Sequence, residues 1–388
     1  MTVIEPALLA RVRARLVEQQ ADPTPTAVAA AMRDERGLVG DTALLAVVAA
    51  LRRESLGAGP LDPLLELPGV TDIVVNGPGQ VYVDTGEGLQ RSDVTFTDDN
   101  AVRRLAQRLA ASAGRRLDDA APWVDVRLRD GTRFHAIVAP LARPGTCLSL
   151  RVPARTVMTL DDWVRAGSVD RAGADLLLEL VGSRAAFVVS GGTGCGKTTL
   201  LSALLSLVDP ADRIVIVEEA TELCPRHPHV VSLEARQPNV EGAGEVTMRD
   251  LVRQALRMRP DRLVVGEVRG AEVVDLLAAL NTGHEGGGGT VHANTAADVP
   301  ARFEALGVAA GISRTAVHAQ LAAALQVVVH LRRSRAGVRH LHELAVLDRD
   351  ERGFVRVETA VTFEPGGRSM VGPGGRALEV VLARHGGQ

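Results

Sequence analysis

The sequence predicts an α/β protein: a doubly wound, mostly parallel sheet, preceded by a smaller α+β domain and a helical N-terminal unit. From residue 172 onward, apolar strand-like runs alternate with stretches of helical periodicity, a pattern typical of a parallel sheet with helices on both faces. Hydrophobic residues make up 46% of the chain but aromatic residues only 2%. The core must therefore be built from Val, Leu, Ala and Ile, which fits alternating strands and helices.

The helical unit is expected over residues 1–58. Apolar residues recur at helical spacing over Pro6–Gln20, Thr26–Arg36 and Asp41–Leu56, and this spacing predicts three short helices. The run Gly57–Pro60 then breaks the pattern, because glycine and proline interrupt regular structure.

The α+β domain is expected over residues 59–155. One helical stretch, Asn100–Ala113, interrupts short alternating runs that are typical of strands. These runs are Ile73–Val75, Val81–Val83, Val124–Arg127 and Phe134–Val138. The next residues, 156–171, are mixed and polar, and they predict a linker or hinge.

The doubly wound domain is expected over residues 172–388. Its first predicted strands are Ala185–Ser190, Arg213–Val217 and Arg262–Val265. Its predicted helices are Thr198–Val208, Thr247–Met258, Asp298–Leu306 and Ser313–Ala324. Further strand-like runs are Val327–Leu331, His342–Leu347 and Phe354–Val361. From Gly366 the sequence is rich in glycine, which predicts a mobile C-terminal tail.

Charge, cysteine content and the lengths of the apolar runs argue against several classes of protein. The formal net charge is −3, with acids and arginines interspersed, so no broad basic face for nucleic acid is expected. The three cysteines have no C-x-x-C spacing, which argues against a disulfide framework or a zinc site and fits a reducing cytoplasm. The longest apolar run, Ala43–Leu51, is far shorter than the ~20 residues that cross a bilayer. The first 20 residues also lack the apolar stretch of a signal peptide.

The only lysine of the chain, Lys197, lies in a complete G-x-x-x-x-G-K-[ST] loop between a predicted strand and a predicted helix. In such a loop, backbone N–H groups cradle the β-phosphate of a nucleotide, the lysine reaches the β and γ oxygens, and the hydroxyl of Thr198 binds Mg²⁺. The nucleotide-binding residues are Gly191, Gly192, Thr193, Gly194, Cys195, Gly196, Lys197, Thr198 and Thr199. We interpret Cys195 as a small filler of the loop rather than a redox switch, because no other cysteine is near it in sequence.

Carboxylates follow two of the predicted strands. Glu267 ends an apolar run, the layout of a Walker B element, in which it would act as the base or orient the attacking water. Glu218 and Glu219, with Glu222 close behind, end the strand after the loop helix, where ligands bind in such sheets. The alternative for this second group is a charge cluster at a helix start. The candidate metal ligands are Thr198, Glu218 and Glu267.

Two histidines, His284 and His292, flank the four glycines Gly286–Gly289. The glycines would let the backbone approach a phosphate, and one imidazole could sense the γ-phosphate. Isolated histidines are more often structural or solvated, so the neighbouring motifs carry this assignment.

Together these segments resemble the secretion superfamily ATPases, and most closely the tight-adherence (Tad/Flp, CpaF-like) pilus assembly branch of the type II/IV secretion ATPases. The resemblance covers Gly59 to about Leu347. It rests on SGGTGCGKTTLLSALL, VEEATEL, LEARQPNVEGAGEVTMRDLVRQALRMRPDRLVVGEVRGAE and ALNTGHEGGGGTVHANTAADVPARFEAL. It implies a RecA-like P-loop ATPase domain. In family terms the Walker A, acidic box, Walker B and histidine box segments are Gly191–Thr199, Glu218–Glu222, Gly266–Glu267 and His284–His292.

The domain that precedes the loop also matches the family, as a PAS-like domain that covers the nucleotide. The matching segments are GPLDPLLELPGVTDIVVNG, VDVRLRDGTRFHAIVAPLA and LSLRVP. The likeness makes Arg133 and Arg151 candidates to contact phosphates across a subunit boundary. Further candidate arginines in the ATPase half are Arg236, Arg253 and Arg257.

The chain departs from the family at two positions. Cys195 stands where serine is frequent, which leaves nucleotide binding intact because backbone N–H groups bind the phosphates. Glu219 stands where aspartate is common, which leaves open whether Glu218, Glu219 or Glu222 approaches the metal. The resemblance further implies a homohexameric ring in the cytoplasm beneath a membrane platform protein.

The leading hypothesis is a Mg²⁺-dependent ATPase that converts hydrolysis into domain rotation and drives pilus assembly or secretion. One alternative is a conjugative or DNA-uptake ATPase. Another is a non-hydrolysing nucleotide-binding scaffold, against which the acidic box and Glu267 stand. A small-molecule kinase fits least, because a whole domain precedes the loop.

Overall fold

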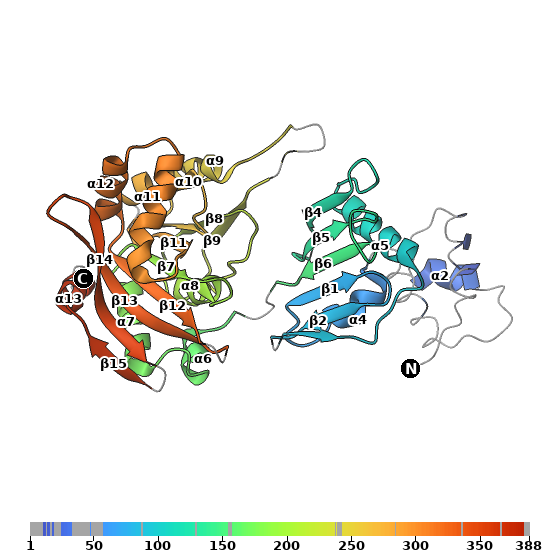
Figure 1. Ribbon diagram of the computed structural model, residues 1–388, viewed down its shortest axis with the longest axis horizontal. Helices are drawn as coiled ribbons and strands as arrows, with labels where there is room; N and C mark the ends of the chain where they lie inside the picture. The colour runs from blue at the N-terminus through green and yellow to red at the C-terminus, as the bar shows by residue number, and fades with distance from the viewer. Residues whose placement is uncertain are drawn as a thin grey trace. The chain divides into compact units, whose positions relative to one another are not determined.

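The chain forms two compact units, Met1–Ala154 and Arg155–Gln388 (Figure 1). The computed structural model describes residues 11–12, 14–15, 18, 25–32, 47, 57–86, 88–128, 130–153, 157–236, 238, 243–283, 285–334, 337–364 and 367–383. Of the three predicted N-terminal helices, the second, Thr26–Arg36, overlaps α2 (Pro25–Met32). The other two lie largely outside the described residues.

The first unit contains an antiparallel sheet with the strand order β3-β2-β1-β6-β5-β4. The strands are β1 (Asp72–Asn76), β2 (Val81–Asp84), β3 (Leu89–Arg91), β4 (Trp123–Arg127), β5 (Arg133–Ile137) and β6 (Cys147–Arg151). The helices are η1 (Gly59–Leu61), α4 (Asp62–Leu65) and α5 (Asp99–Ser112). The Asp98 side chain accepts a hydrogen bond from the backbone N–H of Ala101 and so caps α5, as a short acidic N-cap residue does.

Alternation of buried and more exposed residues along β1, β4, β5 and β6 separates the two faces of this sheet. Inward residues such as Ile73, Phe134 and Leu150 pack with the apolar stripe of α5. The residues between them are polar or half-exposed. One face of the sheet is therefore buried and the other carries its polar side chains, as period-two patterning dictates.

The second unit contains a mixed sheet in the order β15-β14-β13-β12-β7-β11-β10-β8-β9. The strands from β12 to β9 in this order pair in parallel, and β13 to β15 add antiparallel strands at one edge. The central strands are β7 (Phe187–Gly191), β8 (Ile214–Glu218), β9 (Val230–Glu234), β10 (Arg262–Val265) and β11 (Gly288–His292). The remaining strands are β12 (Val327–Arg333), β13 (Arg339–Arg349), β14 (Val355–Glu364) and β15 (Arg368–Val371). A doubly wound, mostly parallel α/β sheet was predicted, and this part of the prediction is confirmed.

Helices cover both faces of this sheet, so its central strands are buried on both sides. One face packs against α6 (Leu160–Arg165), α7 (Arg171–Gly182), α8 (Lys197–Leu205) and α13 (Gly375–Ala383). The other packs against α9 (Met248–Ala255), α10 (Glu272–Leu280), α11 (Val299–Ala309) and α12 (Arg314–Ala324). Short 3₁₀ turns are η2 (Leu256–Met258) and η3 (Ala296–Asp298). Figure 1 shows α9 to α12 gathered on one side of the strands.

The segment predicted as a linker differs from that expectation. Residues from 157 onward belong to the second unit, and α6 forms within them behind a capping box in which Thr159 and Asp162 bond reciprocally. Such a box satisfies the free N–H groups of a short helix. The ring of Trp163 is 1% exposed and lies in the core. The polar residues that suggested a hinge are thus the cap and solvent face of a packed helix.

The glycine-rich tail also differs from the prediction, because part of it is ordered. Residues 368–371 form β15, which pairs with β14, and α13 follows with Leu378 buried in the core. A Cβ at Gly375 would lie 2.4 Å from a methyl group of Val371. Glycine here permits close packing of α13 on the strand rather than mobility. Within the described part of the chain, no helix has the length and apolar character needed to cross a lipid bilayer.

Candidate nucleotide site

The glycine loop joins β7 to α8, at the C-terminal edge of the parallel strands. Gly194 and Gly196 have φ angles of 71° and 94°, which L side chains rarely adopt. A Cβ at Gly191 would lie 2.5 Å from the carbonyl oxygen of Leu331 on β12. A Cβ at Gly196 would lie 2.9 Å from the indole ring of Trp163. The loop backbone is therefore pressed between β12 and α6, and glycine is the residue that fits there.

Lys197 opens α8, and its side chain folds back over the loop. The residue is 7% exposed, and its Nζ donates to the carbonyl oxygens of Gly191 and Gly192 at 3.1 and 2.9 Å. Burial lowers the pKa of this ammonium, and the nearby carboxylate of Glu267 partly offsets the effect. Thr198 and Thr199 follow in the first turn and are half-buried. The N-terminal N–H groups of α8 and the ammonium thus lie together at the C-terminal edge of β7, an arrangement that suits an anion.

Cys195 is 1% exposed and lies in the core beside the loop. Burial raises the pKa of its thiol, although the positive charge of Lys197 acts in the opposite direction. A buried, protonated thiol is a poor nucleophile. Its environment fits a filler of the loop.

Glu267 follows β10 and is held from two sides. Its Oε2 accepts a hydrogen bond from Arg269 Nη2 at 2.7 Å, and its Oε1 lies 3.1 Å from His292 Nε2. Burial acts to raise the pKa of this carboxyl, but the Arg269 hydrogen bond and the charges of Arg269 and Lys197 outweigh it and lower the pKa. Glu267 is therefore an ionised, oriented carboxylate at the strand edge.

His292 ends β11 and lies between the lysine and the glutamate. Its Nε2 is 3.3 Å from Lys197 Nζ as well as 3.1 Å from Glu267 Oε1. Lys197 can only donate and ionised Glu267 can only accept, so this nitrogen serves one partner at a time, according to the tautomer. Burial and then the charge of Lys197 lower the pKa of His292. The imidazole is consequently neutral near pH 7 and can move a hydrogen bond from one neighbour to the other.

The three carboxylates of the acidic box occupy different environments. Glu218 is 3% exposed, and its Oε1 accepts hydrogen bonds from the backbone N–H groups of Glu222 and Leu223, each at 3.0 Å. Glu219 is exposed and accepts a hydrogen bond from Arg269 Nη1 at 3.1 Å. Glu222 is exposed. Glu218 thus shapes the turn after β8, whereas Glu219 joins the charge network around Glu267.

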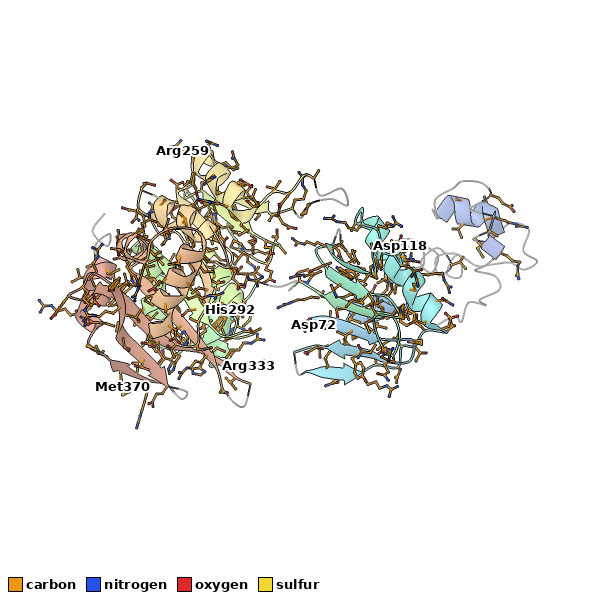
Figure 2. All side chains as sticks on the ribbon, turned by 45° about the horizontal axis from the view of Figure 1, so that its top comes forward. Asp72, Asp118, Arg259, His292, Arg333 and Met370 are labelled. Carbon is orange, nitrogen blue, oxygen red and sulfur yellow. The ribbon has the colours of Figure 1, made fainter. Side chains whose placement is uncertain are left out.

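Several candidates from the sequence lie away from this cluster. Arg253, on α9, forms an ion pair with Asp275, and Arg257 donates to Gln254 Oε1. Figure 2 shows Arg259, two residues beyond Arg257, at the far end of the unit from His292. Arg236 donates through Nε to the carbonyl oxygen of Gly244. These contacts tie each arginine to its own surroundings, in α9, in α10 or at the isolated bridge between Arg236 and Val246.

Arg133 and Arg151 belong to the first unit, at paired positions of β5 and β6. Arg133 forms two hydrogen bonds with the Asp125 carboxylate, and Arg151 is exposed. Both arginines lie on the polar face of that sheet. His284 lies outside the described residues.

Gly288 and Gly289, the last two of the four glycines between the histidines, lie within β11 rather than in a phosphate-binding loop. A Cβ at Gly288 would lie 1.8 Å from the carbonyl oxygen of Phe187, and one at Gly289 would lie 2.2 Å from that of Val265. Gly288 is the first residue of β11, and the last residue, His292, pairs with Gly191 of the glycine loop at the other end of the strand. The glycines therefore let β11 fit between β7 and β10.

The oxygen donors beside the glycine loop fit a magnesium ion. Mg²⁺ prefers oxygen ligands and is usually held by one or two protein groups together with phosphates and waters. The hydroxyl of Thr198 stands in the first turn of α8, and Glu267 follows β10, the strand two places along the sheet from β7. These residues can supply the protein share of such a site.

Comparison with known proteins places this chain in a family. The model of the family described as "Type II/IV secretion system protein" matches residues 54–365. The chain belongs to the type II/IV secretion system protein family. The matched range contains the glycine loop, Glu267 and His292.

The relatives support this assignment. A putative conjugal transfer protein of Mycobacterium tuberculosis is 59% identical over 328 residues, which cover 83% of this chain and 93% of that protein. The probable conjugal transfer protein TrbB of Sinorhizobium fredii is 30% identical, over 79% of this chain and 92% of its own length. The type IV secretion system protein PtlH of Bordetella pertussis is 32% identical over 61% of this chain.

Solved structures share the fold of this secretion-family chain. The ATPase DotB of Legionella pneumophila aligns with a TM-score of 0.52 and 18% identity, over 75% of this chain and 79% of DotB. The pilus retraction motor PilT, solved with bound ADP, aligns with a TM-score of 0.52 and 20% identity, over 83% and 84%. At these identities the likeness concerns the fold alone.

The structure adds residues to this secretion-family site that the sequence did not single out. Arg269 bridges Glu267 and Glu219, and its position two residues after Glu267 was the available signal. Trp163 supports Gly196 from α6, which only the packing reveals. His330 of β12 is 1% exposed, and its Nδ1 lies 2.8 Å from Ser190 Oγ, immediately before the loop. Burial, then the charges of His342 and Arg332, lower the pKa of His330 to about 4.

Proposed function

We propose that this protein is a Mg²⁺-dependent ATPase. The observation that carries the proposal is the convergence of three groups at one strand edge: the ammonium of Lys197, the oriented carboxylate of Glu267 and the imidazole of His292. An anion cradle beside a positioned base is the arrangement that hydrolysis of a phosphoanhydride needs.

The residues divide the work of hydrolysis. The loop N–H groups and Lys197 bind the β- and γ-phosphates, while Glu267 orients a water and accepts its proton as the new oxygen–phosphorus bond forms. The bond from the γ-phosphorus to the bridging oxygen breaks, and ADP leaves with that oxygen. His292 takes a hydrogen bond from Lys197 or gives one to Glu267, so it can report the change in charge between ATP and ADP. A magnesium ion held by Thr198 would neutralise charge on the phosphates.

A phosphate-release assay on the purified full chain tests this proposal. We expect ATP turnover that requires Mg²⁺ in the wild-type protein and none in Lys197→Ala, because the variant lacks the group that binds the β and γ oxygens. The control variant is Arg349→Ala, which changes the last residue of β13. Retained turnover in Lys197→Ala would overturn the assignment, and binding without turnover in the wild type would favour a non-hydrolysing scaffold.

We further propose that the ATPase works as a homohexameric motor in the cytoplasm, against a membrane platform protein, in Tad/Flp-type pilus assembly. Family membership supports a role in a type II/IV secretion machine, and the sequence motifs point to the tight-adherence branch. Native mass spectrometry with and without ATP tests the hexamer. Loss of surface pili on deletion of the gene, restored by the wild type and not by Glu267→Gln, tests the pilus.

Conjugal transfer is the second candidate, because the relatives at 59% and 30% identity carry that name. The deletion strain separates the two functions. Loss of DNA transfer with pili intact would favour the conjugal role.

A further inference from the structure

The order of the strands gives the glycine loop two different sides. The C-terminal ends of parallel strands lie at one edge of a sheet. Across this sheet the neighbouring parallel strands follow the order β12, β7, β11, β10. The loop follows β7, with His292 and Glu267 on the β11–β10 side. Arg333 ends β12 on the opposite side. Figure 2 shows His292 and Arg333 on the same edge of the unit.

Two arginines of the β12–β13 hairpin approach the loop from this opposite side. Arg333 and Arg339 are cross-strand partners. The guanidinium Nη1 of Arg333 lies 3.8 Å from where a Cβ on Gly194 would be, and Cδ of Arg339 lies 3.6 Å from the same position on Gly196. The hairpin thus brings two cations to the phosphate loop itself.

The charges of this pair lack the compensation seen elsewhere in the unit. Arg253, Arg262 and Arg269 each form an ion pair with a carboxylate. Arg333 donates only to a backbone oxygen, that of Gly337, and no carboxylate among the described residues forms an ion pair with Arg333 or Arg339. Both side chains are exposed.

Like charges at directly opposed positions of a β-ladder disfavour folding. Each of the two guanidinium groups carries several N–H donors suited to phosphate oxygens. The pair is therefore an arrangement that a bound anion would stabilise.

We propose that Arg333 and Arg339 together bind the α-phosphate of the nucleotide held by the glycine loop. This inference rests on the proposed nucleotide binding. With the γ-phosphate directed toward Glu267 and His292, the phosphate chain has to continue toward the other side of β7, where the two arginines lie. A cavity of about 440 Å³ lined by Arg332, Arg333, Ser334, His340, His342, Phe363 and Glu364 leaves space beside Arg333.

The test compares nucleotides that share the α-phosphate and differ at the γ-phosphate. Affinities of the full chain for ADP and for the non-hydrolysable ATP analogue AMP-PNP are measured by calorimetry with Mg²⁺. In Arg333→Gln/Arg339→Gln we expect both affinities to fall by the same factor, roughly ten- to hundredfold, the range for charged hydrogen bonds. Arg339→Lys keeps a charge and should lose less. Arg349→Gln, on the same strand at the opposite end, should bind as the wild type does.

The outcomes separate the inference from the function on which it rests. Equal affinity in the double variant and the wild type would overturn the α-phosphate contact, as would a loss confined to AMP-PNP, which would place the arginines at the γ-phosphate. A third probe, inorganic tripolyphosphate, should lose affinity too, and a loss for the nucleotides alone would place the arginines on the nucleoside instead. A wild-type protein that binds none of the probes would reject nucleotide binding itself. Because the double variant loses a repulsive pair, its melting temperature without ligand should not fall, which excludes unfolding as the cause.

Discussion

The two sides of the glycine loop carry different charges, so we call the β10–β11 side the carboxylate side and the β12–β13 side the arginine side. On the β10–β11 side, the carboxylates of Glu267 and Glu219 both accept hydrogen bonds from Arg269, and His292 contacts Glu267. On the β12–β13 side, Arg333 and Arg339 oppose each other across the hairpin. The first side is assembled before any ligand arrives, whereas the second carries surplus positive charge.

The difference shows how one site can use separate groups of residues for catalysis and for ligand binding. A base has to be oriented before the reaction, since reorganising it during the reaction would add to the barrier. A group that only binds can remain uncompensated, because the anionic ligand supplies its partner. Variants on the first side should therefore change turnover, and variants on the second should change affinity.

The largest effect is expected on the carboxylate side, from Glu267→Gln. The amide keeps the shape but cannot accept the proton of the attacking water, so we expect turnover to fall by roughly 10²- to 10⁴-fold, the usual contribution of a general base. Binding of AMP-PNP should be nearly unchanged. Steady-state phosphate release and calorimetry measure the two quantities, and a parallel loss of both would contradict the proposed division.

A smaller effect is expected from Arg269→Ala. Its hydrogen bond helps to lower the pKa of Glu267, while burial acts to raise it. Removing the arginine leaves burial less opposed, so the carboxyl becomes protonated at higher pH. The acidic limb of the kcat–pH profile should therefore move to higher pH, with kcat at neutral pH reduced by about tenfold, the effect of one charged hydrogen bond.

Arg269→Lys is the control for this prediction, because it retains a positive charge two residues from Glu267. Its profile should lie between those of the wild type and the alanine variant. An unmoved acidic limb in Arg269→Ala would show that another group sets the ionisation of the base.

The smallest effect is expected on the arginine side, from Arg339→Gln without nucleotide. Removing one of two opposed like charges should raise the free energy of unfolding by about 0.5 kcal/mol, within the range for cross-strand pairs. Urea denaturation of this variant and of Arg349→Gln measures the difference. A destabilised Arg339→Gln would mean that the pair is already compensated in the free protein.

Much of the carboxylate side could be predicted from the sequence. The loop, the strand before it and the helix after it are contiguous, so their relation needs no tertiary information. Glu267 follows an apolar run, and parallel strands end at the same edge, which places it near the loop. The bridge from Arg269 to Glu219 joins residues 50 positions apart, and no local pattern encodes such a contact.

Elsewhere the same residue types had two interpretations that only packing separates. Gly288 and Gly289 could let the backbone approach a phosphate or let a strand pack closely against its neighbours. The backbone oxygens of Phe187 and Val265 leave no room for a Cβ at these positions, so close strand packing is the correct interpretation. The polar residues near Thr159 could mark a hinge or a helix cap. They form the cap of α6, and this helix is fixed in the core by the buried Trp163. Gly375 likewise packs against Val371.

The sequence by itself determined the α/β fold of the second unit and the position of the glycine loop between a strand and a helix, because buried strands and a glycine-rich turn are formed by consecutive residues. Only the tertiary structure decided which charges face each other. Glu219, Glu267 with Arg269, and His292 come from three separate segments of the chain and meet only in the folded protein. Arg333 and Arg339 lie opposite each other because of the register in which β12 pairs with β13. Electrostatic pairing depends on distance in space, and strand order and register set that distance.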